Sequence, residues 1–116
     1  MKTINSTTIR GSAPERGFAL RWPTIRGSVT MEREVMFHPI RRWRFDFANT
    51  AHKVAIEIEG ATWSGGRHVR GTGFANDCEK YNTATMLGWS VFRLTPEMAK
   101  DRTVLQSIAD FIKFNT

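Results

Sequence analysis

Residues 44–60 read RFDFANTAHKVAIEIEG, and this stretch decides the fold. On either side of the polar segment NTAH, apolar and polar residues alternate, which is the pattern of half-buried strands. The strand expected at residues 42–48 places three apolar side chains on one face: Trp43, Phe45 and Phe47. The strand expected at residues 53–59 does the same with Val54, Ile56 and Ile58. The stretch therefore predicts a central β-hairpin whose loop is NTAH.

The polar face of this hairpin carries carboxylates. With NTAH as the loop, Arg44 lies opposite Glu57, and Asp46 is a diagonal neighbour of Glu57 with Cβ atoms about 7 Å apart. Glu59 shares the face because strand side chains alternate with period 2. Oxygen ligands at this spacing suit a divalent cation, Mg²⁺ or Mn²⁺ rather than Zn²⁺. The alternative is an exposed face on which acids and arginines alternate for solubility and Arg44 pairs with Glu57.

The charge of the chain favours a polyanionic partner. Its 116 residues include 17 Lys and Arg against 11 Asp and Glu, a formal net charge of +6. Arginine matches phosphate oxygens with a planar fork, and a basic surface binds nucleic acid by releasing counterions. The arginines expected to contact nucleic acid are Arg42, Arg44, Arg67 and Arg70. A basic charge that serves solubility alone is the alternative.

The remaining sequence predicts one α/β domain at residues 13–116 after a disordered tail at residues 1–12. A short helix at residues 14–22 precedes a strand at 33–38 and the hairpin. A glycine-rich loop leads to a helix at residues 74–87, on which Cys78 and Tyr81 belong to an apolar stripe. A strand at 89–94 follows, and Thr95 caps a C-terminal helix that breaks near Asp101.

Compartment signals are few. Cys78 is the one cysteine, so an internal disulfide is excluded and a reducing compartment is expected. The N-terminal residues lack the apolar core of a signal peptide, and no apolar run is long enough to cross a bilayer. We therefore expect a cytoplasmic protein with no membrane partner.

The strings RFDF, AIEIEG and GWSVFR, together with His68, Asp77 and Lys80, resemble the PD-(D/E)XK nuclease superfamily. Within it they look most like the small domains related to very-short-patch repair (Vsr-like) endonucleases of bacteria and phages. The resemblance covers roughly residues 33–100. It implies a restriction-endonuclease-like αβββαβ core, with a four-stranded mixed sheet flanked by helices and a C-terminal helix. It also places the protein in a bacterial cell or a phage-infected host.

The resemblance assigns roles to individual residues. Asp46 and Glu57 become ligands of Mg²⁺ (or Mn²⁺), with the backbone carbonyl of Ile58 as a third ligand. Glu59 stands where many members have lysine, and there it would orient the attacking water. The missing positive charge would then come from Lys80 or His68. Glu15 is the candidate for the acid that many members carry on their first helix.

Several of these residues also have ordinary explanations. His68 is either a general acid or base or an exposed loop histidine. Lys80 either reaches the scissile phosphate or forms an ion pair with Asp77. Trp63 either stacks on a DNA base or caps the core.

The expected function is a Mg²⁺-dependent DNA endonuclease that acts at mismatches or other DNA structures in bacterial or phage repair and recombination. A catalytically inactive nucleic-acid-binding module on the same fold is the main alternative, and a protein-interaction domain is a third. One small domain offers little surface for reading DNA sequence, so a homodimer or a partner protein is also expected.

Overall fold

A computed structural model describes residues 11–60 and 71–115. The helical elements are α1 (Ala13–Arg21), the 3₁₀ turn η1 (Trp22–Thr24), α2 (Gly71–Met86), α3 (Pro96–Lys100) and α4 (Arg102–Phe114). The strands are β1 (Glu32–Met36), β2 (Arg44–Asn49), β3 (Val54–Ile58) and β4 (Ser90–Leu94). They form one sheet in the order β1-β2-β3-β4, antiparallel except for the parallel pair of β3 and β4. The prediction of an α/β fold with a four-stranded mixed sheet, flanking helices and a C-terminal helix is confirmed.

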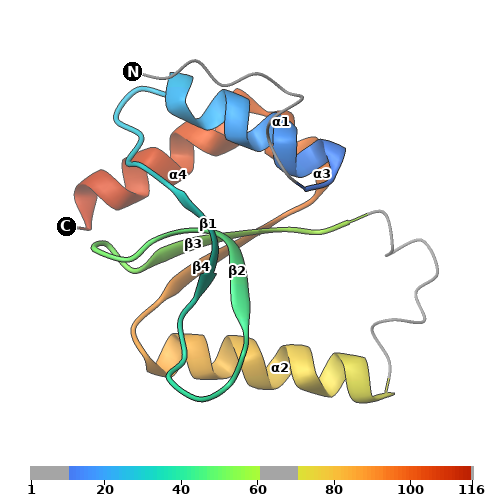
Figure 1. The fold of residues 1–116 in the computed structure, drawn as a ribbon. Coiled ribbons are helices and arrows are strands. Elements are labelled where there is room, and N and C mark those ends of the chain that lie inside the picture. The colour runs from blue at the N-terminus through green and yellow to red at the C-terminus, as the bar shows by residue number, and fades with distance from the viewer. Residues whose placement is uncertain (1–10, 61–70, 116) are drawn as a thin grey trace.

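The helices cover the two faces of the sheet unequally. Figure 1 shows α1, α3 and α4 together on one face and α2 alone on the other. Among the described residues, no helix is long and apolar enough to cross a membrane.

Side-chain caps set where the helices begin. Ser12, expected in the disordered tail, accepts a hydrogen bond from the Glu15 N–H (3.3 Å) and caps α1. Thr95 accepts from the Met98 N–H (3.2 Å), and Asp101 ends α3 and caps α4 through the Thr103 N–H (2.9 Å). The predicted cap and the predicted break near Asp101 are both confirmed.

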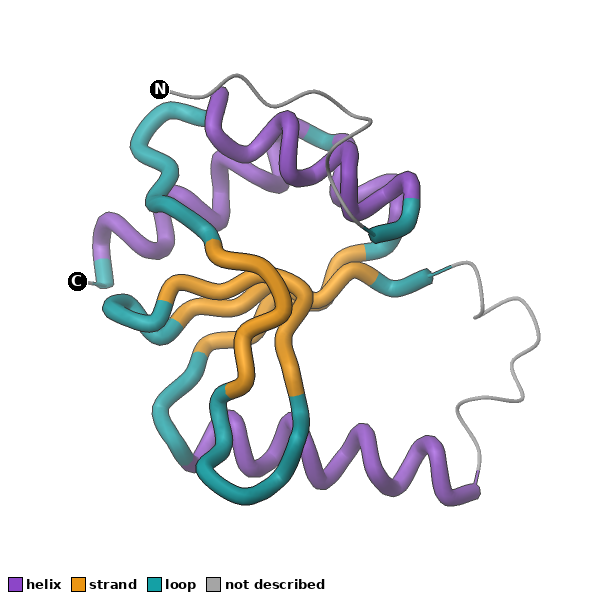
Figure 2. The backbone as a smooth tube through the Cα atoms, in the orientation of Figure 1, coloured by secondary structure: helices purple, strands orange, loops and turns teal. Residues whose placement is uncertain are grey.

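Figure 2 shows helical segments on both sides of the sheet. Two apolar clusters lie on its opposite faces. The larger one joins the sheet to α1, α3 and α4, and its fully buried members include Phe18 and Leu105. The smaller one lies on the α2 side and consists of Phe45, Ala48, Ala55, Ala84 and Trp89. Small residues at three of these five positions give α2 little apolar surface to bury.

Phe45 and Phe47 pack in different clusters, so the prediction that Trp43, Phe45 and Phe47 share a face is wrong. β1 pairs with β2 through Arg33↔Phe47 and, two residues further along β1, through Val35↔Phe45. Between these pairs Glu34 has a φ of 50°, which is rare for a residue with a side chain in a strand. The backbone of the β1–β2 pair turns at this point, and the two phenylalanines consequently face opposite layers.

The hairpin register also differs from the expectation. Asn49 stays in β2 and pairs with Val54, so the loop spans residues 50–53. Asn49 Oδ1 accepts the His52 N–H (2.9 Å), and Lys53 closes the turn with a φ of 53°. The shift amounts to two residues and changes the partners across the hairpin. The predicted pairing of Arg44 with Glu57 is wrong, because Arg44 forms its ion pair with Glu34 (3.3 Å).

The predicted apolar stripe on α2 is also wrong in part. Phe74 is 52% exposed and Cys78 is exposed, whereas Tyr81 is half-buried and Ala84 is fully buried. The described turns at the start of α2 therefore lie away from the smaller cluster, and the helix uses its later turns to pack on the sheet.

Candidate carboxylate site

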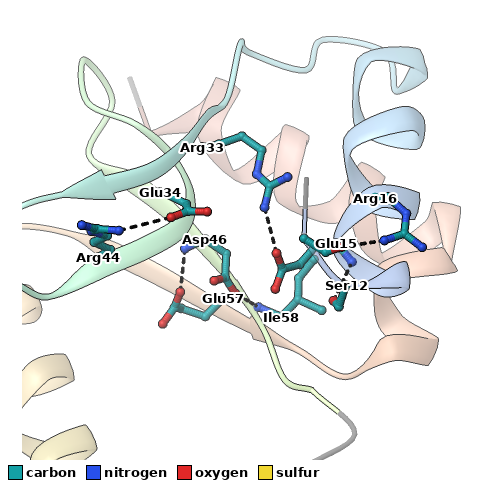
Figure 3. A network of polar contacts seen from close by, with 10 residues as sticks. Ser12, Glu15, Arg16, Arg33, Glu34, Arg44, Asp46, Glu57 and Ile58 are labelled. Carbon is teal, nitrogen blue, oxygen red and sulfur yellow. Dashed lines mark hydrogen bonds and ion pairs between the residues drawn. The ribbon is translucent and has the colours of Figure 1, made fainter. Parts of the chain in front are cut away.

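Asp46 and Glu57 meet where β2 and β3 separate. Continuing the observed register places these two residues directly opposite each other. The Asp46 N–H donates to Glu57 Oε2 (2.8 Å), and the Ile58 N–H donates to Asp46 Oδ2 (2.8 Å). Figure 3 shows both contacts between the strands. Each carboxylate therefore takes a backbone donor of the opposite strand, which satisfies that N–H where the ladder opens.

Glu57 is the one charged residue among the described ones that is buried, at 7% exposure. Its Oε1 accepts hydrogen bonds from Lys80 Nζ (2.6 Å) and the Tyr81 hydroxyl (2.7 Å), both on α2. With the Asp46 N–H, three donors surround this carboxylate. Charge-assisted hydrogen bonds of this number offset the cost of removing a carboxylate from water.

Asp46 carries more negative charge around it than positive. Burial and the charge of Glu57, with a smaller contribution from Glu15, raise the pKa of its carboxyl from 3.8 to about 6. The hydrogen bond from Ile58 and the charge of Lys80 act in the opposite sense and only partly compensate. A like-charge site of this kind gains from a bound cation.

Glu15, the candidate acid on the first helix, lies beside this pair. It belongs to the first turn of α1, and its Oε1 accepts from Arg33 Nη2 (2.8 Å). In Figure 3 its carboxylate lies next to that of Asp46, on the side away from Glu57. The fold thus brings together three acids that are far apart in the sequence.

Glu59 is not part of this group. Both of its side-chain oxygens accept from Arg93 on β4, at 3.0 and 3.2 Å, and its N–H donates to the Leu94 carbonyl (2.8 Å). β3 and β4 are parallel, with Glu57 opposite Arg93, so Glu59 is drawn toward the outer strand. Both oxygens of Glu59 are thus engaged by Arg93, although strand alternation keeps Glu59 on the same face of β3 as Glu57.

The surrounding cations are divided between paired and unpaired ones. Arg44 is held by Glu34, whereas Arg42 is exposed and forms no ion pair with the described residues. Lys80 pairs with Glu57 rather than with Asp77, its expected alternative partner. Four predicted site residues fall outside the described residues: Trp63, Arg67, His68 and Arg70.

Tyr81 is the participant that sequence reasoning did not identify. It was placed on the apolar stripe of α2, yet its hydroxyl binds Glu57, and the guanidinium of Arg93 lies 4.6 Å from its ring centroid. Burial and the neighbouring Glu57 raise the pKa of this phenol, so it stays protonated and donates. The sequence offered one signal for this role: Tyr81 directly follows Lys80. Two adjacent side chains can reach the same acceptor when their helix lies alongside it.

The donor set fits a hard cation better than a soft one. Within residues 11–60 and 71–115, no three His, Cys, Asp or Glu side chains are grouped closely enough to hold a metal by themselves. Mg²⁺ commonly takes one or two carboxylates and completes its shell with water and phosphate oxygens. Asp46, Glu57 and the Ile58 carbonyl are compatible with that mode.

No protein-family model, curated protein or solved structure matches this chain.

Proposed function

We propose that this protein is a metal-dependent DNA endonuclease with Asp46 and Glu57 at its active site. The observation that carries the proposal is the pairing of these two carboxylates, one half-buried and one buried, where β2 and β3 separate. A stable fold gains little from placing two acids side by side, whereas a cation-dependent hydrolase needs them there.

The order of elements supports the same proposal. The chain runs α1, β1, β2, β3, α2, β4, which agrees with an αβββαβ core. In such a core the resemblance puts the acids on the second and third strands, and these are the strands that hold Asp46 and Glu57.

The cation would be held by Asp46, Glu57 and the carbonyl of Ile58. Asp46 Oδ1 makes no hydrogen bond to the described residues and is available as a ligand, since only Oδ2 accepts the Ile58 N–H. When bound, Mg²⁺ or Mn²⁺ lowers the pKa of coordinated water and stabilises negative charge on the phosphate oxygens. Glu15 extends the acidic side of the site next to Asp46.

Lys80 is the residue that takes the place of the missing lysine. Position 59 is an acid engaged by Arg93, so it supplies no positive charge to the site. Lys80 Nζ lies 2.6 Å from Glu57 Oε1, on a side chain that is 14% exposed. We assign it two tasks: it orients Glu57, and it stabilises the charge that develops on the phosphoryl group.

DNA is the proposed substrate because the chain is basic and because a cation site bordered by arginines suits a phosphodiester. Arg42 and Arg44 are both exposed, just before β2 and at its first residue, and would contact the phosphate backbone of the DNA. A role in bacterial or phage DNA repair or recombination, within the cytoplasm, is the corresponding biological proposal.

Cleavage of supercoiled plasmid and of mismatched or branched duplexes with Mg²⁺ tests the proposal. Asp46→Asn and Glu57→Gln should each lower the rate by more than about a hundredfold. Glu97→Gln, at an exposed position on α3, is the matched control and should cleave at the wild-type rate. Equal cleavage by Asp46→Asn and wild type would refute the assignment.

A DNA-binding module without catalysis is the second candidate. It is favoured by one observation: both oxygens of Glu57 already accept hydrogen bonds within the protein. This candidate predicts salt-sensitive DNA binding and no cleavage with Mg²⁺ or Mn²⁺. The same plasmid assay, run beside a binding titration, separates the two.

A further inference from the structure

The loop between β1 and β2, residues 37–43, has an unusual combination of rigidity and exposure. Ile40 at its tip is 83% exposed, the highest value among the exposed large hydrophobic residues of the described chain. Isolated exposed aliphatic residues are common on proteins. This one, however, sits on a loop that the structure fixes at several points.

His38 fixes the backbone of the tip. Its Nδ1 accepts hydrogen bonds from the N–H groups of Ile40 (3.1 Å) and Arg41 (2.9 Å). Pro39 lies between His38 and Ile40, and its ring restricts its own φ angle. The backbone of the turn is therefore held by a side chain, and Ile40 stays at the tip of the loop.

Trp43 fixes the sides of the loop. The guanidinium of Arg41 lies 3.9 Å from the centroid of one of its rings, while Phe37 stacks on it at 6.1 Å and His38 meets it edge-on at 5.5 Å. Phe37 in turn stacks on the fully buried Phe45 at 4.1 Å. These contacts connect the loop to the smaller apolar cluster, so it moves with the sheet.

The loop also lies close to the carboxylate site. Arg41 binds Glu79 of α2 through two hydrogen bonds, at 3.0 and 3.3 Å. The next residue along the helix, Lys80, is the one that binds Glu57. Figure 1 shows the β1–β2 loop reaching α2. The loop is thus connected to the same helix that positions Glu57.

The charge of the loop selects the type of ligand. Residues 37–44 contain three arginines and no acid, and Arg42 next to the tip forms no ion pair with the described residues. An apolar tip flanked by cations is complementary to duplex DNA, in which charged phosphates border apolar base steps. Proteins that kink DNA insert Phe, Leu, Ile, Met or Pro between such steps.

We propose that the β1–β2 loop is a DNA wedge, in which Ile40 enters between neighbouring base pairs while Arg42 holds the adjacent phosphate. This deepens the proposed function and rests on its choice of duplex DNA as substrate. It also gives a physical reason for preferring mismatched sites, because a mismatched step costs less to unstack than a paired one.

The experiment uses a short duplex with 2-aminopurine beside a mismatch, titrated with the full chain in EDTA so that no cleavage occurs. Wild-type protein should raise the 2-aminopurine fluorescence several-fold as the base unstacks. Ile40→Ser should abolish this rise and weaken binding about tenfold, with the slope of log K against log salt unchanged. Arg42→Ala should keep the fluorescence rise and reduce the salt slope by about 1.

Phe114→Ser is the matched control. Phe114 is 79% exposed, but it lies at the end of α4, on the face of the sheet opposite α2. This variant should behave like wild type in both measurements. Far-UV circular dichroism establishes that each variant is folded, and Ile40→Ala provides a milder second change at the same position.

Several results would overturn the wedge: no fluorescence rise with wild type, an equal rise with Ile40→Ser, or no duplex binding. A shift in the sedimentation of the free protein on Ile40→Ser would mean that the loop contacts a second copy of the chain, and would also overturn it. Failure of the proposed function looks different. A protein that unstacks the duplex through Ile40 but never cleaves with Mg²⁺ keeps the wedge and loses the nuclease.

Discussion

The two faces of the sheet differ in what holds them. On the face covered by α1, α3 and α4, large apolar side chains fill the interface, among them Phe18, Ile56 and Leu105, all at 0% exposure. On the face covered by α2, small residues dominate and a buried ion pair lies among them. The first face has the composition of an apolar core, and the second carries the buried charges of a functional site.

This asymmetry indicates how stability and chemistry are divided in a chain of 116 residues. Apolar burial on the α1 side contributes most of the favourable free energy of folding. The α2 side is consequently free to hold the buried Glu57, whose charge acts on the neighbouring Asp46 and works against folding. Enzymes often place destabilising groups at the site and compensate for them elsewhere.

The largest expected effect on the free energy of unfolding comes from truncating a large buried side chain in the apolar cluster on the α1 side. Phe18→Ala removes a ring that stacks on Trp22 at 5.6 Å and contacts Phe47 at 4.7 Å. It should lower the free energy of unfolding by about 3–5 kcal/mol, measured by urea denaturation. Val35→Ala, which trims a half-buried residue next to the smaller cluster, is the comparison on the other face. If Val35→Ala cost as much as Phe18→Ala, the proposed division between the faces would be wrong.

Breaking the buried ion pair should have the next largest effect. Lys80→Met leaves Glu57 buried with one charged partner fewer and should cost about 3 kcal/mol. The double variant Lys80→Met/Glu57→Gln removes both charges and should recover most of this loss. Urea denaturation of the two single variants and the double variant completes the cycle, and additive losses would show that the pair is not coupled.

Much of the sheet was predictable from the sequence because its signals are local. Period-2 alternation located β2 and β3, and the cap at Thr95 and the break expected near Asp101 located the last two helices. The faces of Asp46 and Glu57 followed from the same alternation, and a register error of two residues left them unchanged.

The contacts of the site were harder to predict because they depend on tertiary geometry. Phe45 and Phe47 pack in opposite layers beside the positive φ of Glu34 on the neighbouring strand, and no residue in RFDF signals this. The choice of Arg93 by Glu59 follows from β4 lying beside β3, which only the topology provides. Tyr81 was assigned to an apolar stripe because a tyrosine at helical spacing resembles a core residue until its hydroxyl partner is known.

A smaller effect on the free energy of unfolding is expected at Asp46. Here the substitution should stabilise the metal-free protein, whereas the previous two should destabilise it. The pKa of Asp46 is about 6 in the folded chain, above its ordinary value of 3.8. Between these values the folded state binds this proton more tightly than the unfolded state, so the contribution of Asp46 to metal-free stability should fall as pH rises from about 4 to 6. Asp46→Asn should lack this fall and be more stable at pH 7 by about 1 kcal/mol, after discounting for the exposure of this group.

Thermal unfolding of both proteins across this pH range, in EDTA and in Mg²⁺, measures the effect. Mg²⁺ should stabilise wild type at pH 7 and should stabilise Asp46→Asn less, because the amide is a weaker ligand than the carboxylate. A stability difference between Asp46→Asn and wild type that does not grow in favour of Asp46→Asn between pH 4 and 6 in EDTA would contradict the electrostatic account of the site.

The smallest effect is expected at Tyr81, where removing one hydroxyl distinguishes a role in folding from a role in positioning Glu57. Tyr81→Phe keeps the ring under Arg93 and removes only the donor to Glu57 Oε1, so it should cost about 1 kcal/mol. Lys80 still binds that oxygen and the Asp46 N–H still binds the other, so Glu57 stays buried but is oriented by fewer donors. If Tyr81 only supports the fold, Mg²⁺-dependent cleavage should be unchanged once stability is restored at low temperature. If it positions Glu57, the Mg²⁺ concentration for half-maximal cleavage should rise about tenfold, as it does when outer-shell partners of metal ligands are lost.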